Sequence, residues 1–243
     1  MKMKNETMME HLKELRKGII ISLIAFLMGA LVCYFYLDET LMSIVFNPIR
    51  HIGKDVVLTG VAEGFMIQLK LACIGGIILS APIILWQIIW FVLPALYKNE
   101  MKVFIIYFSL SLVLFISGIM LGYLYVLGIG LHTFLIDYNK GFATMISASR
   151  YMSFVISFLL PFGLIFQIPL ITYFLSYIGV IKPSFMKKKR AYAILIILIF
   201  AAVLTPPDIL SQILLSLPMI LLYEISILIA VFVDRKRKRK QSQ

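Results

Sequence analysis

Six long apolar runs constrain this chain more than any other feature of its sequence. They cover residues 18–37, 65–96, 103–136, 151–177, 191–204 and 210–233. A helix rises about 1.5 Å per residue, so about 20 apolar residues cross the ~30 Å hydrocarbon core of a bilayer. Hydrophobic residues make up 61% of the chain and charged residues 14%, which excludes soluble, disordered and fibrous proteins. The sequence therefore predicts an all-α polytopic membrane protein with six transmembrane helices in a single domain, 1–243.

The basic residues gather on one side of the predicted membrane. Of the 23 Lys and Arg residues, 18 lie in the two terminal segments and in the loops near 97–102 and 179–190, and five lie in the alternate loops. Because Lys- and Arg-rich loops stay in the cytoplasm, we expect both termini there. The net charge of +11 thus indicates topology rather than nucleic-acid binding. Residues 1–18 are predicted to form an amphipathic cytoplasmic segment, and 234–243 a basic tail that meets anionic lipid.

The last two crossings are expected to be short. The fifth run has 14 residues before Pro206 and Pro207, which is about 21 Å as a helix. Glu224 interrupts the sixth run, and a carboxylate at mid-membrane costs roughly 2.5–3.5 kcal/mol. We therefore expect its membrane part to end near Tyr223. The alternative is that the sixth helix continues and Glu224 pairs inside the bundle.

Several spans contain prolines, which bend membrane helices. Together with the two short helices they predict a concave bundle. A glycine pair in the third run, Gly118 and Gly122, has the spacing of a helix-packing motif. A short surface helix is expected after Asp38, because apolar residues recur there with helical spacing. The prolines within the spans are Pro82, Pro94, Pro161, Pro169 and Pro218.

Two carboxylates on the basic side are candidates for a binding site. Glu14 lies in the N-terminal segment, which carries an apolar stripe and is expected to turn into the first span near Gly18. Glu100 lies in the next loop on the same side. Pairing with neighbouring lysines and arginines is the simplest interpretation, worth ~0–1 kcal/mol for each exposed pair. Alternatively the two carboxylates form a receptor for a cationic ligand, for which the forked guanidinium group is the best match.

Motifs for enzymatic chemistry are missing from the sequence. It has no phosphate-binding G-x-x-x-x-G-K-[ST] run, no H-E-x-x-H zinc motif and no G-x-S-x-G nucleophile motif. The three histidines and the two cysteines are widely spaced. The sequence thus predicts a protein that is not an enzyme and has no metal site or cofactor.

Four separated motifs extend in order across nearly the whole chain. They are HLKELRK at 11–17, SAPIILWQ at 80–87 continuing through Phe91 and PALYK at 94–98 to Glu100, PFG at 161–163 with FQIP at 166–169, and TPPD at 205–208 followed by SQ at 211–212, Pro218 and Glu224. In this order the chain resembles the TatC family, the multi-pass core of the twin-arginine protein translocase. The resemblance implies a receptor that binds twin-arginine signal peptides of folded precursors. It also implies recruitment of TatA-type single-span subunits, and of TatB-type subunits where present, for export driven by the proton-motive force.

The resemblance further implies a multi-pass protein of the cell membrane that forms homo-oligomers within a receptor complex. Glu14 and Glu100 match the positions that meet the two arginines, and Thr205 and Gln212 match the polar site where the single-span partner docks. The matching neighbours in the signal-peptide region are Leu12, Arg16, Phe91, Leu96 and Tyr97. Other positions that match structurally or functionally important positions of the family are Pro48, Pro82, Pro94, Gln167, Pro206, Asp208 and Glu224.

At position 167 the sequence departs from the pattern of the TatC family, and two other classes of function are also compatible with the sequence. Gln167 stands where many family members carry a glutamate, and a neutral amide cannot carry a proton or an anionic charge.

A secondary transporter would suit the broken helices and Glu224, although the sequence has no inverted repeat and few intramembrane charges. A purely structural, lipid-organising protein is the third possibility.

Overall fold

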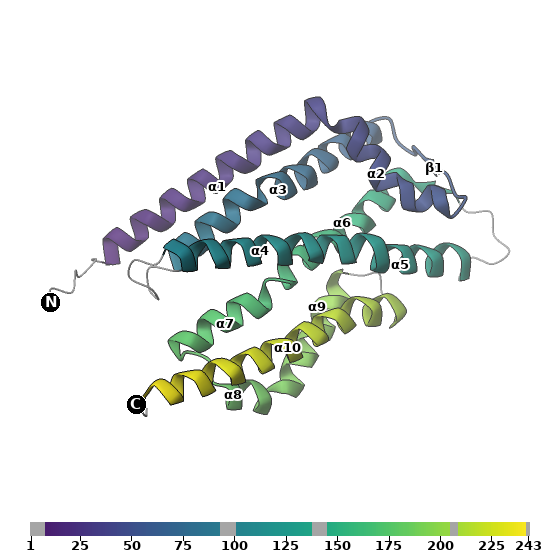
Figure 1. Ribbon diagram of the computed structural model, residues 1–243. Helices are drawn as coiled ribbons and strands as arrows, with labels where there is room; N and C mark the ends of the chain where they lie inside the picture. The colour runs from purple at the N-terminus through teal and green to yellow at the C-terminus, as the bar shows by residue number, and fades with distance from the viewer. Residues whose placement is uncertain (1–7, 93–100, 138–144, 205–208, 242–243) are drawn as a thin grey trace. The chain divides into compact units, whose positions relative to one another are not determined.

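Long apolar helices dominate the computed structural model, which describes residues 8–92, 101–137, 145–204 and 209–241 (Figure 1). A helix is the expected form, because in lipid every backbone N–H and C=O needs a partner within its own segment. Five helical stretches of the described chain, two of which combine consecutive helical elements, are long and apolar enough to cross a membrane: Leu12–Tyr36, Glu63–Phe91, Phe104–Ile136, Ala148–Ile178 and Ser211–Lys236. The predicted all-α polytopic fold is therefore confirmed. The sixth crossing, the concave shape and the cytoplasmic termini stay predictions.

The elements follow one another with short connections. In chain order they are α1 (Met8–Tyr36), α2 (Asp38–His51), β1 (Val56–Val57), α3 (Glu63–Val92), α4 (Met101–Leu121), the π-helical segment η2 (Gly122–Leu127), α5 (Gly128–His132), the π-helical segment η3 (Thr133–Asp137), β2 (Ile146–Ser147), α6 (Ala148–Ile165), α7 (Ile168–Ile178), α8 (Pro183–Lys188), α9 (Arg190–Leu204) and α10 (Ile209–Gln241). The described residues fall into two compact units, one from 1–46 and 60–112 and the other from 47–59 and 113–243. Helices α2 and α4 contribute residues to both.

In the first unit, α1 packs antiparallel to α3 at very short range. A Cβ atom added to Gly76 would lie 2.7 Å from the backbone nitrogen of Ala30, and one added to Gly29 would lie 3.0 Å from the Gly76 carbonyl oxygen. Glycine is thus required for this approach, as at the small-residue interfaces typical of membrane helices. The result is a fixed register between α1 and α3.

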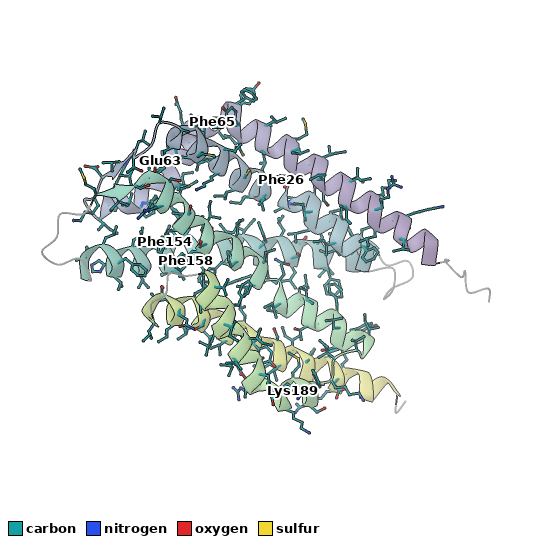
Figure 2. All side chains as sticks on the ribbon, turned by 180° about the vertical axis from the view of Figure 1, so that it is seen from behind. Phe26, Glu63, Phe65, Phe154, Phe158 and Lys189 are labelled. Carbon is teal, nitrogen blue, oxygen red and sulfur yellow. The ribbon has the colours of Figure 1, made fainter. Side chains whose placement is uncertain are left out.

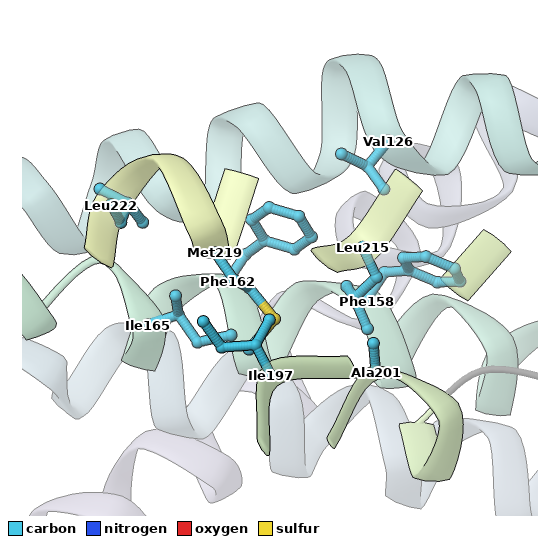
Figure 3. Close-up of a cluster of buried hydrophobic side chains, with 9 residues drawn as sticks. All are labelled: Val126, Phe158, Phe162, Ile165, Ile197, Ala201, Leu215, Met219 and Leu222. Carbon is cyan, nitrogen blue, oxygen red and sulfur yellow. The ribbon is translucent and has the colours of Figure 1, made fainter. Parts of the chain in front are cut away.

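In the second unit, α6 lies at the centre of the packing. Phe158 and Phe162 are fully buried one turn apart on α6, and residues from η2, α9 and α10 surround them (Figure 3). Phe154 extends this aromatic stack, with its ring centroid 4.7 Å from that of Phe158 (Figure 2). The other members of the cluster are Val126, Ile165, Ile197, Ala201, Leu215, Met219 and Leu222.

The predicted glycine packing motif is confirmed in this unit. A Cβ atom on Gly118 would lie 2.6 Å from the carbonyl oxygen of Phe162, and one on Gly122 would lie 3.2 Å from the Phe162 ring. Close approach of α6 therefore depends on the absence of side chains at both positions.

The fourth apolar run is two helices rather than one. Helix α6 ends at Ile165, and α7 begins at Ile168 with Pro169 in its first turn. Pro169 has no N–H to donate to the carbonyl of Ile165, four residues earlier, and its ring clashes with that carbonyl in a regular helix. Pro169 therefore favours the break between α6 and α7, although Pro82, Pro161 and Pro218 each lie inside a continuous helix.

Two expectations about helix ends are wrong. Helix α1 is continuous from Met8 to Tyr36, so there is no turn at Gly18, because one glycine costs a helix only about 1 kcal/mol. Helix α10 is not short but runs for 33 residues through Glu224. Its continuation is explained by an ion pair that neutralises Glu224, described below. Helix α9, with 15 residues, is short as expected.

Candidate functional site

Glu14 lies at the end of α1 that packs against the last turns of α3. A Cβ atom on Gly18 would lie 3.6 Å from Oε1 of Gln87, and the two helices are antiparallel. Residues four apart share one face of a helix. Moving one turn back along α1 from Gly18 reaches Glu14, and one turn forward along α3 from Gln87 reaches Phe91. The register therefore places Glu14 and Phe91 on facing turns.

The other two candidates on α1 lie on a different face. Leu12 and Arg16 are each two residues from Glu14, which rotates them by about 200° around the helix axis. The side chains of all three residues are exposed. Of these candidates, only Glu14 is therefore on the face that meets α3.

Several candidates lie outside the described residues. These are Pro94, Leu96, Tyr97, Glu100, Thr205, Pro206 and Asp208. The segment that contains Glu100 follows directly after α3, whose last turns include Phe91. The chain connectivity thus leads from Phe91 into the segment that holds the second candidate carboxylate.

An aromatic cluster adjoins this end of α3. The rings of Trp86 and Trp90 both pack edge-on against the buried ring of Phe104 in α4, with centroid distances of 4.5 and 5.5 Å. The two indoles remain partly exposed, which is typical of aromatic residues at the level of lipid headgroups. Packing of this kind holds the end of α3 rigidly beside α4. Pro82 lies inside α3, one turn before Trp86.

Gln212, the second candidate for partner docking, joins the two helices at the C-terminal end of the chain. Its Nε2 donates a hydrogen bond of 3.0 Å to the backbone carbonyl of Leu198 in α9. The amide therefore ties α10 to α9, and its carbonyl oxygen is the part of the side chain with acceptor capacity for another helix.

Gln167 occupies the break between α6 and α7. Its side chain is buried, and its backbone N–H bonds to the carbonyl of Leu164 in the turn. A buried neutral amide at a helix break suits a structural role, because it can satisfy backbone groups without carrying charge.

Pro48 in α2 is held between two tyrosine contacts that the sequence analysis did not identify. The side chain of Asn47 hydrogen-bonds with that of Tyr123, and the backbone of Ile49 hydrogen-bonds with the buried Tyr151. The adjoining loop forms a two-residue parallel pairing in which β1 meets β2. The region around Pro48 is thus fixed to η2 and α6. No local sequence pattern signalled these partners, since they lie about 75 and 100 residues away in the chain.

Glu224 forms an ion pair with Arg190, the first residue of α9, whose Nε donates to its Oε1. As in the alternative, α10 continues past Glu224 and Glu224 is paired, but the pair is partly exposed and not inside the bundle. Both side chains are partly exposed, at 56% for Arg190 and 30% for Glu224. A partly exposed, paired carboxylate carries less of the charge penalty than the isolated mid-membrane carboxylate on which the expectation of a short helix rested.

We expect Glu224→Gln to lower the free energy of unfolding by at most about 1 kcal/mol, because the pair is partly exposed and screened. Thermal unfolding of the purified protein in detergent would measure this, with Arg190→Gln and the double variant completing a mutant cycle. A loss of several kcal/mol would contradict a surface pair and indicate a deeply buried carboxylate.

No group of three or more His, Cys, Asp and Glu side chains in the described part of the chain is arranged to hold a metal ion. The candidate site consists of the carboxylate of Glu14 on α1 and the aromatic ring of Phe91 on the facing turn of α3.

Comparison with known proteins identifies the family. The family model described as Sec-independent protein translocase protein (TatC) matches residues 10–218. The TatC protein of Carboxydothermus hydrogenoformans is 42% identical over 95% of each chain, and TatCy of Bacillus subtilis is 34% identical over 100% of this chain and 95% of its own.

A solved structure shows the same fold. The crystal structure described as the twin arginine translocase receptor TatC has a TM-score of 0.82 and 34% sequence identity, and the match covers 92% of this chain and 99% of the other. A second crystal structure of that receptor, in the detergent DDM, has a TM-score of 0.83 at 34% identity over 90% and 98% of the two chains. The chain described here belongs to the TatC family of Sec-independent protein translocase components and is a multi-pass membrane protein.

Proposed function

We propose that this protein is the core receptor subunit of a twin-arginine translocase. It binds the arginine pair of a signal peptide through Glu14 and Glu100 and recruits a TatA-type subunit, with a TatB-type subunit where one exists. It does so in the cell membrane with both termini in the cytoplasm, and the proton-motive force drives export. The observation that carries the proposal is the register that sets Glu14 opposite Phe91.

The chemistry of this end of the first unit supports arginine recognition. A carboxylate accepts two parallel hydrogen bonds from a guanidinium group, and an aromatic face adds a cation–π contact. Glu14 supplies the first group and Phe91 the second, while Leu12 and Arg16 line the outer face of the same helix end. Partner docking is proposed for Gln212 and Thr205, where an amide acceptor in the membrane would attract a polar side chain of a single-span helix.

The transporter alternative has less support than the sequence suggested. Glu224, the carboxylate on which that alternative relied, forms a partly exposed ion pair with Arg190 at the start of α9. An ion-carrying residue needs to change its charge state or partner during transport, and a partly exposed structural pair serves helix packing instead.

Site-specific photo-crosslinking tests the proposal. A photoreactive residue at position 14 or 91 is expected to crosslink to a twin-arginine signal peptide. The same probe at position 35 is the matched control, because Phe35 is exposed at the other end of α1, about 30 Å away. Crosslinks at 14 and 91 should fall when the peptide's arginines are replaced by lysines. Equal crosslinking from position 35, or no response to the lysine replacement, would contradict the proposed site.

A further inference from the structure

A short basic corner lies between α7 and α9 in the second unit. Helix α7 ends at Ile178, and the residue that follows it, Gly179, has a φ of 85°, a left-handed conformation that glycine adopts readily. After four residues the chain enters α8, and Met186 of α8 is buried against Ile227 and Ala230 of α10. The hydroxyl of Tyr223 donates a 3.0 Å hydrogen bond to the carbonyl of Met186. The corner is therefore anchored on α10.

The outward side of this corner is strongly basic. Lys182, Lys187 and Lys188 are exposed, and no acidic side chain in the described ranges forms an ion pair with any of them. Phe185 lies between them in sequence and is 61% exposed. Exposed lysines thus flank an exposed aromatic side chain in a segment that Met186 anchors.

The neighbouring cations have partners of their own. Arg190 forms the ion pair with Glu224, and the Nζ atom of Lys189 lies 4.7 Å from the ring centroid of Tyr192 (Figure 2 labels Lys189). The carboxylate of Glu224 is thus paired with Arg190 and not with one of the three lysines. Tyr192, like Phe185, is mostly exposed. The three lysines consequently present their charge outward rather than to the protein.

We infer that Lys182, Lys187 and Lys188 form a binding site for the phosphate groups of anionic phospholipids. Helix α9, the predicted fifth crossing, is apolar and begins directly after α8, which would put the corner at the membrane surface. Exposed Phe185 and Tyr192 match the aromatic residues that sit at headgroup level, and lysines beside them attract anionic lipid. The inference rests on the membrane fold and is independent of signal-peptide binding.

A lipid accounts for these features better than an acidic protein does. Lysines alone would suit either ligand, but the exposed aromatic side chains next to them favour a ligand with both a phosphate and an apolar part. A free phosphate ion would leave the aromatic side chains without a role. The ligand is therefore a phospholipid with a net negative charge, such as phosphatidylglycerol.

Native mass spectrometry of the purified full chain can measure the binding directly. Titration with phosphatidylglycerol is expected to give a dissociation constant that rises about fivefold for each lysine removed, or roughly 25-fold for the variant Lys187→Gln/Lys188→Gln. The matched control Arg50→Gln/Lys54→Gln removes two charges from another surface of the same unit and should leave the constant unchanged. The variant Lys187→Arg/Lys188→Arg keeps the charge and should retain binding.

Three results would overturn the inference. The first is an unchanged dissociation constant in Lys187→Gln/Lys188→Gln when its helical content matches that of the unsubstituted protein. The second is displacement of the lipid by inorganic phosphate, which would assign the corner to free anions. The third is loss of polyglutamate binding in that variant without loss of phosphatidylglycerol binding, which would assign it to an acidic protein.

Discussion

Glu14→Gln is expected to weaken binding of a twin-arginine signal peptide about 10- to 100-fold. A hydrogen bond to a charged group contributes about 1.5–3 kcal/mol, and the amide cannot accept the bidentate contact that a carboxylate offers. Glu100→Gln should have an effect of similar size. Fluorescence anisotropy with a labelled peptide and the protein in detergent measures the dissociation constant.

The same assay contains its own controls. A peptide with two lysines and an identical apolar segment should respond far less to Glu14→Gln, because lysine makes no forked contact. Glu39→Gln removes one exposed carboxylate from α2 and should leave binding unchanged. Equal losses for arginine and lysine peptides, or for Glu14→Gln and Glu39→Gln, would show that general charge and not a specific contact controls binding.

Gly76→Leu should be among the most destabilising single substitutions in α3. Even a Cβ atom at this position would lie 2.7 Å from the backbone nitrogen of Ala30, and backbone atoms cannot move aside as a flexible side chain can. Overpacking costs about 1–3 kcal/mol where neighbours can adjust, so we expect a loss of about 3 kcal/mol or more. The apparent Tm of the protein in detergent is the measurement.

Gly64, in the same helix, provides a matched control for Gly76→Leu. A Cβ atom added to Gly64 in α3 would meet nothing within 4 Å, so Gly64→Leu should leave the Tm nearly unchanged. Because Gly76 also sets the spacing between α1 and α3, its substitution should weaken signal-peptide binding through Glu14 as well. Equal Tm values for the two variants would contradict the close-packed register.

The long helices were predictable because hydropathy is a local property with a large energetic effect. Each residue in lipid must satisfy its own backbone, so an apolar run of about 20 residues leaves few alternatives to a helix. The positions where helices break or end were harder to predict from the sequence. Pro169 was visible in the sequence, but so were Pro82, Pro161 and Pro218, which lie inside continuous helices, so a proline alone did not predict the position of a break. The length of α10 depended on Arg190, which is 34 residues from Glu224 in the chain.

In the candidate site, too, local features could be predicted from the sequence and long-range contacts could not. The motifs around Glu14, Phe91 and Glu100 could be found along the chain, because they consist of neighbouring residues of recognisable chemistry. That Glu14 and Phe91 lie on facing turns could not be found that way, since it follows from the approach of Gly18 to Gln87 and of Gly29 to Gly76, which set the register of α1 on α3.

Membrane insertion and family membership thus follow from the order of residue types along the chain. Long-range packing, in contrast, fixes which faces meet, how α8 is anchored on α10 and which charges are paired. The physical reason is that transfer into lipid is a sum over residues of one segment, whereas close approach depends on the shapes of two segments at once.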